Sequence, residues 1–399
     1  MARVQFPSRS GLQLSGTLDL PPGGVWHASA LFAHCFTCSR NFKAARNISR
    51  TLAAAGFAVL RFDFTGLGES EGDFADTSFS SNLDDLEDAA HWLTGQLAAP
   101  QLLLGHSLGG AAVLAVAERL DSVRALATLA APASPEHVLT HFGEGLARIE
   151  AEGSAEVTLG GRSFRIRRDF IEDARSHDLG ERLRTLRRAL LVLHAPGDTI
   201  VSIDNAQQIF LAARHPKSFV SLDDADHLLS READSRYAGR VIAAWASRFL
   251  EPRAGAAVEG VQISGRTADG FVCSVQAGPH VLVADEPERN GGADEGLDPY
   301  QFLATALGTC TVMTLNMYAR RKKLALERVI CRVDHRKVHA QDCADCETHD
   351  GRIDELTRAI VIEGELSANE RRRLLEIADR CPVHRTLAGE IKVRTTLEE

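Results

Sequence analysis

The chain has 399 residues, a formal net charge of −9, and 44% hydrophobic and 25% charged residues. That length exceeds what one hydrophobic core usually serves, so we expect two domains. The acidic balance argues against nucleic acid or an anionic membrane as the main partner. The longest apolar runs have the length of strands, so we expect no membrane span.

Residues 1–7 are polar and strand-like, and they lack the apolar region of a signal peptide. We therefore expect a cytoplasmic protein, in which most of the eight cysteines are reduced. The cysteine positions then matter for reactivity more than for covalent bracing of the fold.

The first two thirds of the chain alternate short apolar runs with helical stretches. Residues 4–20 predict an antiparallel hairpin. Further strands are predicted at 28–33, 57–64, 102–104, 123–129, 189–194 and 218–222, and helices at 41–55, 83–97, 111–120, 203–214 and 236–250. This alternation predicts an α/β fold, a doubly wound and mostly parallel sheet with antiparallel strands at one edge.

Residues 132–185 interrupt that alternation. They predict a helix, a hairpin turning at 160–161 and two more helical segments. Ligands bind at the carboxyl ends of strands in open α/β sheets, and an insertion at this point would overhang them. We interpret it as a small cap, with a peripheral excursion as the alternative.

A second domain of α+β type is predicted after a linker. Residues 251–260 have the small, polar, Pro- and Gly-containing composition of a linker, which we place at 252–260 between domains at 1–251 and 261–399. Beyond it we predict strands within 261–283, a long apolar helix at 299–321, strands at 329–338 and 356–364, a helix at 368–380 and a last strand at 389–397. The apolar surface of so long a helix in so small a domain must be buried by other residues, and a partner chain can provide them.

The motif Gly-His-Ser-Leu-Gly at 105–109 follows three leucines and precedes a small-residue helix. A buried strand, a sharp turn and a helix are the context of a nucleophile elbow, with Ser107 at the turn. Gly105 and Gly109 leave room where a Cβ would collide with a neighbouring element. The alternative is a glycine-rich turn with an incidental serine.

A serine hydroxyl needs a base to take its proton. Asp198 ends a predicted strand and turn, and His227 follows the next strand, 29 residues later. This order of serine, acid and histidine is that of α/β-hydrolases. We predict Ser107 as nucleophile, His227 as general base and Asp198 as the group that orients it.

Other candidates for these roles are weaker. His194 lies inside an apolar strand and is interpreted as a packed residue, and His106 points away from the face of Ser107. Asp223, Asp224 and Asp226 lie too close in sequence to His227 for the usual geometry.

The charge that develops on the acyl oxygen needs two amide donors. One is Leu108, which follows the nucleophile. The segment His-Cys-Phe-Thr-Cys-Ser at 34–39 resembles the His-Gly-Phe-Thr-Gly-Ser loop of dienelactone-hydrolase-like and feruloyl-esterase-like α/β-hydrolases, and 63–70 resembles their Asp-x-x-Gly-x-Gly-x-Ser turn. The resemblance implies Phe36 as the second donor, with Cys35 as the neighbouring option.

Cysteines at 35 and 38 replace both glycines of that loop. Such a pair invites a redox or metal interpretation. We favour the simpler one, in which the loop tolerates a small side chain at both positions, because no second ligand pair is evident nearby.

Residues 291–310, ending in Cys310, and the motif Cys-Pro-Val-His at 381–384 resemble the OsmC/Ohr family over roughly 258–399. The resemblance implies that Cys310 is a peroxidatic thiol, which attacks an organic hydroperoxide, and that Cys381 resolves the sulfenic acid as a disulfide. It also implies an intertwined homodimer, an external dithiol as reductant, and no bound cofactor or metal.

One position departs from that family. Peroxidase-active members carry Glu after the Pro of the first motif, where this chain has Tyr300. Glu295 is a possible substitute, and the Arg that activates the thiolate cannot be assigned from the sequence. The alternative role of this domain is dimerisation or ligand binding.

Residues 339–349 hold two Cys, Cys343 and Cys346, and two His in a spacing that metals use. A zinc site, a disulfide-forming loop and an unligated polar loop all fit this pattern. We favour the loop without metal, because a single short loop rarely closes a tetrahedral site.

Together these patterns predict a serine esterase acting on small carboxylic esters, short-chain or aryl, fused to an OsmC-like domain that reduces organic hydroperoxides. A thioesterase or lactonase fits the same triad, since the triad does not distinguish acyl leaving groups.

Overall fold

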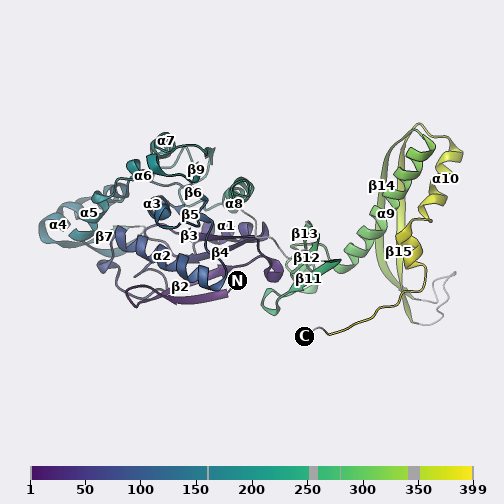
Figure 1. The fold of residues 1–399 in the computed structure, drawn as a ribbon, viewed down its shortest axis with the longest axis horizontal. Helices are drawn as coiled ribbons and strands as arrows, with labels where there is room; N and C mark the ends of the chain where they lie inside the picture. Colours follow the sequence, from purple (N-terminus) through teal and green to yellow (C-terminus); the bar gives the residue numbers. More distant parts are fainter. Residues whose placement is uncertain (1, 160, 251–258, 279, 340–350, 398–399) are drawn as a thin grey trace. The chain divides into compact units, whose positions relative to one another are not determined.

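The computed structural model describes residues 2–159, 161–250, 259–278, 280–339 and 351–397 (Figure 1). The chain divides into two compact units, one comprising Met1–Asp269 with Cys273–Val281 and the other Gly270–Val272 with Leu282–Glu399. Most of the predicted linker, and both cysteines of the 339–349 loop, lie outside the described residues. The predicted domain boundaries at 251 and 261 stay a prediction.

An eight-stranded sheet forms the centre of the first unit, in the order β1-β2-β4-β3-β5-β6-β9-β10. Its strands are β1 (Ala2–Pro7), β2 (Gln13–Asp19), β3 (Ala28–Ala33), β4 (Phe57–Phe62), β5 (Leu102–His106), β6 (Ala125–Leu129), β9 (Ala189–His194) and β10 (Lys217–Ser221). β1 and β2 pair antiparallel, as do β2 and β4, and the other neighbours are parallel. The predicted doubly wound α/β sheet with an antiparallel edge is confirmed.

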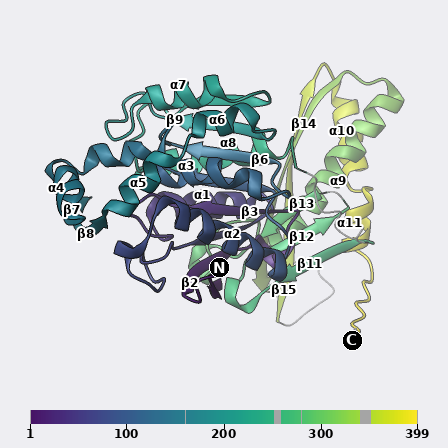
Figure 2. The same ribbon diagram turned by 60° about the vertical axis from the view of Figure 1, so that its left-hand side comes forward.

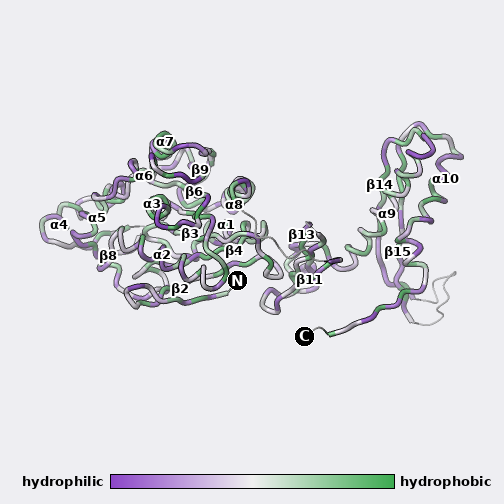
Figure 3. The backbone as a smooth tube through the Cα atoms, in the orientation of Figure 1, coloured by the Kyte–Doolittle hydropathy of each residue, from purple (hydrophilic) through white to green (hydrophobic). Residues whose placement is uncertain are grey.

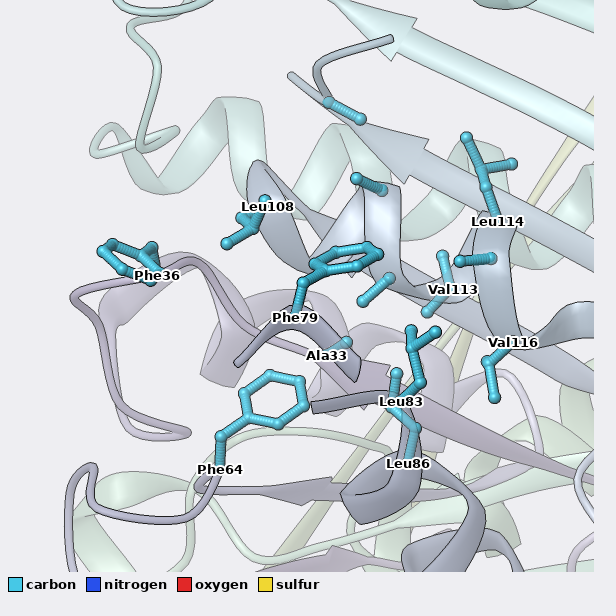
Figure 4. Close-up of a cluster of buried hydrophobic side chains, with 14 of the residues drawn as sticks. Ala33, Phe36, Phe64, Phe79, Leu83, Leu86, Leu108, Val113, Leu114 and Val116 are labelled. Carbon is cyan, nitrogen blue, oxygen red and sulfur yellow. The ribbon is translucent and has the colours of Figure 1, made fainter. Parts of the chain in front are cut away.

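Two hydrophobic cores cover the two faces of this sheet, because successive strand residues point to opposite sides. Leu103 belongs to the core beneath α2 (Phe79–Gln96), α3 (Leu108–Val116) and α7 (Ile203–Ala212). Its neighbours Leu102 and Leu104 belong to the core beneath α1 (Lys43–Ala54) and α8 (Glu232–Ala246). Figure 4 shows part of the first core, where Phe79, Leu83 and Leu86 of α2 meet α3.

The insertion after β6 contains η4 (Pro135–His141), α4 (Glu144–Glu152), β7 (Ser154–Leu159), β8 (Arg162–Arg167), α5 (Arg168–Ser176) and α6 (Leu179–Thr185). The predicted hairpin and helices are therefore present. Ile149, Phe164 and Phe170 bury their side chains in the same core as α2 and α3. The insertion is thus packed onto the first unit.

The rest of the chain is of α+β type, as predicted. It contains β11 (Val261–Gly265), β12 (Cys273–Ala277), β13 (His280–Ala284), α9 (Pro299–Lys322), β14 (Leu326–His339), β15 (Arg352–Gly364), α10 (Ala368–Ala378) and α11 (Pro382–Leu387). β11, β12 and β13 form one sheet, and β14 pairs antiparallel with β15. Short 3₁₀ segments lie at Pro22–Gly24 (η1), Phe74–Asp76 (η2), Ala117–Arg119 (η3), Thr267–Asp269 (η5) and Glu288–Asn290 (η6).

The strand predicted at 389–397 is wrong, because the described residues there form no strand. Its β-branched residues Ile391 and Val393 are 54% and 86% exposed. A strand needs a partner to pair its backbone, and within the described part of the chain this segment pairs with none.

α9 packs along β14 and against α10 and α11, and both ribbon views show it beside the β14–β15 hairpin (Figures 1 and 2). A capping box of Asp298 and Gln301 begins the helix, and Lys323 in the left-handed conformation ends it. Hydrophobic positions recur along it among polar ones (Figure 3). Met313 and Met317 are 69% and 67% exposed, so the described part of the chain leaves these apolar side chains of the helix uncovered.

Among the described residues, α9 is long and apolar enough to cross a membrane by length and composition alone, with 28% of its apolar window buried. This is the long apolar helix predicted at 299–321, and the expectation that no segment spans a membrane stays a prediction. Length and composition are also satisfied by the central helix of a domain that is buried by a partner.

Candidate active site

Ser107 occupies a sharp turn between β5 and α3, with φ 54° and ψ −126°. A non-glycine residue adopts this conformation only where the surroundings enforce it. A Cβ on Gly105 would lie 2.2 Å from the carbonyl oxygen of Gly109, and one on Gly109 would lie 2.4 Å from the carbonyl oxygens of Ala33 and His34. The close packing of β5, α3 and the loop after β3 therefore requires both glycines.

The structure brings Ser107, His227 and Asp198 together from three loops at the carboxyl ends of β5, β10 and β9. His227 Nε2 lies 3.1 Å from Ser107 Oγ, and His227 Nδ1 lies 2.7 Å from Asp198 Oδ2. A carboxylate at Nδ1 fixes the proton there, which leaves Nε2 free to accept the proton of the serine. The Ser107 hydroxyl proton is therefore placed to pass to His227, while Asp198 orients the imidazole and stabilises its charged form.

Asp198 is itself held in place by its own loop. Its Oδ1 accepts hydrogen bonds from the backbone amides of Ile200, at 2.8 Å, and Val201, at 3.0 Å. Burial by itself raises the pKa of Asp198, but the hydrogen bonds from His227 and Val201 outweigh it, and the net pKa is lowered. Asp198 therefore stays ionised beside the base.

The competing acids use their carboxylates elsewhere. Asp223 accepts a hydrogen bond from the hydroxyl of Ser221, and Asp226 accepts one from the amide of Ser230. Neither makes a hydrogen bond to His227 within the described part of the chain.

Two buried histidines brace the loops of the triad. His106 Nε2 donates to the backbone carbonyl of His227 at 2.7 Å, and His194 Nε2 donates to the carbonyl of Val201 at 2.8 Å. Burial, and secondly the neighbouring His227, lower the pKa of His106 to about 3. His106 is therefore neutral at ordinary pH, and its single ring proton makes this bond. This contact was not predictable from a local pattern, because it joins two residues 121 positions apart.

Phe36 and Leu108 lie around one small cavity of about 10 Å³, which His34, Cys35 and Gly109 also line. Leu108 is the first residue of α3, so no carbonyl within the helix can accept its amide proton. No hydrogen bond among the described residues uses either amide. Figure 4 shows the two side chains at the start of α3 and on the neighbouring loop.

A buried ionic network supports the loop that carries Phe36. Arg40 and Asp63 are 2% and 1% exposed and form an ion pair, and the amide of Arg40 also donates to Asp63 at 2.6 Å. Glu69 pairs with the other side of the Arg40 guanidinium. A Cβ on Gly68 would lie 2.2 Å from the Asp63 carboxylate, which explains the second glycine of the 63–70 turn.

Cys35 and Cys38 form a disulfide in the structure. This corrects the expectation that both are reduced and merely tolerated in place of glycine. The spacing alone did not decide the matter, because a loop of two intervening residues can hold the sulfurs either bonded or apart. Here the backbone folds back on itself, with the amide of Cys38 donating to the carbonyl of Cys35 at 3.3 Å, and this brings the two Cα atoms to 5.3 Å.

An aromatic cluster joins the loop to the insertion. The ring of Phe36 lies 5.0 Å from that of Phe74 and 5.2 Å from that of Phe170, centroid to centroid, and 6.4 Å from that of Phe142. Burial, and secondly the neighbouring His227, lower the pKa of His141 at the end of η4. Phe142 and Phe170 of the insertion therefore pack against the loop of Phe36.

In the second unit, Cys381 is fully buried at the start of α11 and Cys310 is half-buried in α9. Cys381 Sγ accepts from the amide of His384 at 3.3 Å and lies 3.7 Å from the hydroxyl of Thr311, the neighbour of Cys310. Among the described residues no disulfide or hydrogen bond joins Cys310 to Cys381. The structure thus places Cys381 beside the turn of α9 that contains Cys310, and the two sulfurs are not bonded.

The sequence analysis left the arginine of the thiol site unassigned. In the structure, Arg358 on β15 donates hydrogen bonds to residues that lie next to the two cysteines. It donates to Thr311 Oγ1 at 2.9 Å, to His384 Nδ1 at 2.9 Å and to Asp379 at 2.7 Å. The available signal was an arginine between Leu356 and Ile360, at an inward position of an alternating strand.

The two residues singled out at the start of α9 have structural partners. Tyr300 stacks on His335, with ring centroids 4.1 Å apart and planes 6° from parallel. The backbone amide of Glu295 donates to Asp285 at 3.2 Å. The contact of Glu295 uses its backbone amide and gives its carboxylate no role at the thiols.

Comparisons with known proteins support both units. A family model described as serine aminopeptidase, S33, matches residues 38–154, and one described as OsmC-like protein matches residues 291–396. The crystal structure of the esterase domain of a Rhodothermus marinus protein is 49% identical, covers 63% of this chain and 99% of its own, and superposes with a TM-score of 0.53.

The chain belongs to the α/β-hydrolase family and carries an OsmC-like domain.

More distant relatives of this hydrolase share its fold. The esterase Est1E of Butyrivibrio proteoclasticus, solved with ferulic acid, is 19% identical over 62% of the chain and 98% of its own, with a TM-score of 0.54. The mouse palmitoyl-protein thioesterase ABHD10, mitochondrial, is 30% identical over 190 residues. The match covers 45% of the present chain and 62% of the length of the mouse protein.

Proposed function

We propose that the first unit is a serine esterase that cleaves small carboxylic esters, short-chain or aryl, through an acyl-enzyme. The observation that carries the proposal is the path from Ser107 Oγ through His227 to Asp198, with separations of 3.1 and 2.7 Å. The similarity to the Rhodothermus esterase domain supports the same reaction class.

The reaction follows from the geometry. His227 Nε2 takes the hydroxyl proton as Ser107 Oγ attacks the ester carbonyl, and Asp198 stabilises the resulting imidazolium. The oxyanion accepts hydrogen bonds from the amides of Leu108 and Phe36. His227 then returns the proton to the leaving alcohol, and water enters by the same route to release the acid.

The aromatic rings around Phe36 favour an aryl or short acyl group. The rings of buried Phe142 and Phe170 and of half-buried Phe74 supply apolar surface beside the loop. Such rings pack well against a flat aromatic acyl group.

The test is hydrolysis of p-nitrophenyl esters from acetate to palmitate by the wild type and by Ser107→Ala. We expect turnover that is highest for short or aryl acyl groups and that the substitution abolishes. Turnover that survives Ser107→Ala would overturn the proposal.

Thioester hydrolysis is the second candidate, favoured by the similarity to a protein named as a palmitoyl-protein thioesterase. The same Ser107 would attack, because the triad does not select the leaving group. A palmitoyl thioester hydrolysed with a higher kcat/KM than every oxygen ester would favour this alternative.

For the OsmC-like domain we propose reduction of organic hydroperoxides. The Cys310 thiolate attacks the O–O bond, which releases the alcohol and leaves a sulfenic acid, and Cys381 condenses with it to a disulfide and water. An external dithiol restores both thiols. The loss of hydroperoxide consumption in Cys310→Ser tests this proposal, and a wild type that consumes none with any dithiol would leave the domain the alternative role of dimerisation or ligand binding.

A homodimer through this domain belongs to the proposal. The apolar side chains of Leu303, Met313 and Met317 on α9 are exposed among the described residues, and a second copy of the domain would cover them. The cytoplasmic location stays a prediction, and the mouse relative is named as mitochondrial.

A further inference from the structure

The loop that carries Phe36 is closed by a covalent bond. The Cys35–Cys38 disulfide spans Phe36 and Thr37, so the predicted oxyanion donor lies inside a ring of four residues. Of the described cysteines, the other four, at 273, 310, 331 and 381, are free. The hydrolase unit therefore carries its one described disulfide at the site of its chemistry.

We propose that the Cys35–Cys38 disulfide positions the Phe36 amide, so that ester hydrolysis depends on the oxidation state of this pair. The inference rests on the proposed esterase function. Catalysis by an oxyanion hole requires donors that are fixed before the charge develops, because a donor that must reorganise loses most of its benefit.

Hydrogen bonds hold the loop at its ends and across its turn, where the amide of Cys38 donates to the carbonyl of Cys35 at 3.3 Å, a long distance for such a bond. His34 Nδ1 donates to the carbonyl of Cys35 at 2.7 Å, and its Nε2 accepts from the amide of Phe64 at 3.4 Å. At the other end, Arg162 of the cap donates to the carbonyl of Thr37 at 3.4 Å. The Phe36 ring is held in the aromatic cluster, and the peptide that carries its amide lies within the ring that the disulfide closes.

Reduction releases this restraint without removing the substrate-binding rings. A dithiol attacks the more exposed sulfur, that of half-buried Cys38, and forms a mixed disulfide. Its second thiol then displaces Cys38, so that two thiols form in the loop and the reductant becomes a cyclic disulfide. Two electrons and two protons pass to the protein, and a disulfide or an organic hydroperoxide can reverse the step.

Reduction of the disulfide should lower kcat and leave KM nearly unchanged. Removal of one oxyanion donor costs about 10²–10³ in kcat, so loosening a donor that stays nearby should cost about tenfold. KM should stay within about twofold, since uniform binding by the aromatic cluster is unchanged.

The experiment compares hydrolysis of p-nitrophenyl acetate by the full chain before and after reduction with tris(2-carboxyethyl)phosphine. Thiol titration and mass spectrometry establish the state of Cys35 and Cys38 in each sample. We expect kcat to fall about tenfold on reduction and to return on reoxidation. The double variant Cys35→Ala/Cys38→Ala should have the reduced kcat with or without reductant, and Cys273→Ala should respond as the wild type does.

Equal kcat in the two verified oxidation states, or a higher kcat after reduction, would overturn the inference. Because the wild type alone gives this answer, a double variant that fails to fold does not prevent the test. Failure of the proposed function looks different, since the oxidised wild type would then hydrolyse no ester, or Ser107→Ala would retain activity.

Discussion

The surroundings of Ser107 and of Cys310 differ in how many of the groups expected at each site a single chain supplies. Around Ser107, the base, the orienting acid and the buried support all come from the same unit and lie at hydrogen-bonding distances. Around Cys310, the second thiol approaches the neighbouring residue, while the methionines of α9 stand exposed.

The difference follows from the hydrophobic cores. The hydrolase unit has a large core on each face of its sheet, and these cores fix the strand ends that carry the triad. In the second unit, the described core cluster has four buried members, Leu315, Leu374, Ile377 and Ala378. A domain with so little core gains stability by association, which is why we expect the thiol site to need a second copy and the serine site not to.

The largest expected effect concerns the triad. Asp198→Asn should lower kcat for ester hydrolysis about 10⁴-fold, because the amide stabilises the wrong tautomer of His227. Asp223→Asn is the matched control, since that carboxylate bonds to Ser221 instead. Steady-state kinetics check both, and a comparable loss in the control would show that the wrong acid has been assigned.

The next prediction separates the two units by their need for a partner. Met313→Asp combined with Met317→Asp should convert the dimer to a monomer, because the exposed apolar face of α9 would have to bury two charges. Ester hydrolysis should remain and hydroperoxide reduction should fall. Leu211→Asp places the same charge on α7, at 69% exposure in the hydrolase unit, and should leave the dimer intact.

Analytical ultracentrifugation measures that outcome directly. A wild type that sediments as a monomer at all concentrations, or a double variant that remains dimeric, would contradict the interface on α9.

A smaller effect is expected at His106. His106→Phe should lower kcat for esters about tenfold, because the loss of one buried hydrogen bond of about 1 kcal/mol releases the His227 backbone. His106→Gln keeps a donor and should recover most of the rate. The pH profile of kcat should broaden or shift in the Phe variant alone, and an unchanged profile with unchanged kcat would limit His106 to packing.

The last prediction concerns the stability of the hydrolase unit as a function of pH and leaves the reaction itself aside. Burial raises the pKa of Asp85 to about 6 from an ordinary value of 3.8, against the opposing hydrogen bonds from Thr65. The folded carboxyl therefore holds its proton to higher pH than the unfolded one, so its stabilising contribution is present at low pH and is lost as the pH rises from 3.8 to about 6. Asp85→Asn removes this dependence.

Urea unfolding followed by tryptophan fluorescence measures it, since Trp26, Trp92 and Trp245 all lie in the hydrolase unit. Relative to the wild type, the variant should gain up to about 3 kcal/mol between pH 4 and pH 7. A constant difference across that range would contradict a shifted Asp85.

The hydrolase part of the fold was predictable because its signals are local. Three leucines, a glycine pair and a serine specify the elbow, and the loops of Asp198 and His227 follow strands whose carboxyl ends must share one edge of a parallel sheet. The disulfide was not predictable in this way, because the spacing of Cys35 and Cys38 is compatible with either oxidation state. Only the folded path of the loop between them decides the pairing.

Contacts between distant segments account for the other differences. Arg358 reaches Thr311 and His384 across β15, α9 and α11, and the sequence marks it only as a charge at an inward strand position. The alternation at 391–393 resembles a strand, yet the described segment finds no partner to pair with. Local patterns indicate what a segment can form, and tertiary contacts decide whether it does.

The most direct test of the account is covalent labelling of the wild type with a fluorophosphonate, followed by peptide mass spectrometry. The account predicts one adduct per chain, on the peptide that contains Ser107, with loss of ester hydrolysis in proportion to labelling. An unlabelled Ser107 in an enzyme that still hydrolyses esters, or an adduct on another residue that abolishes the activity, would contradict it.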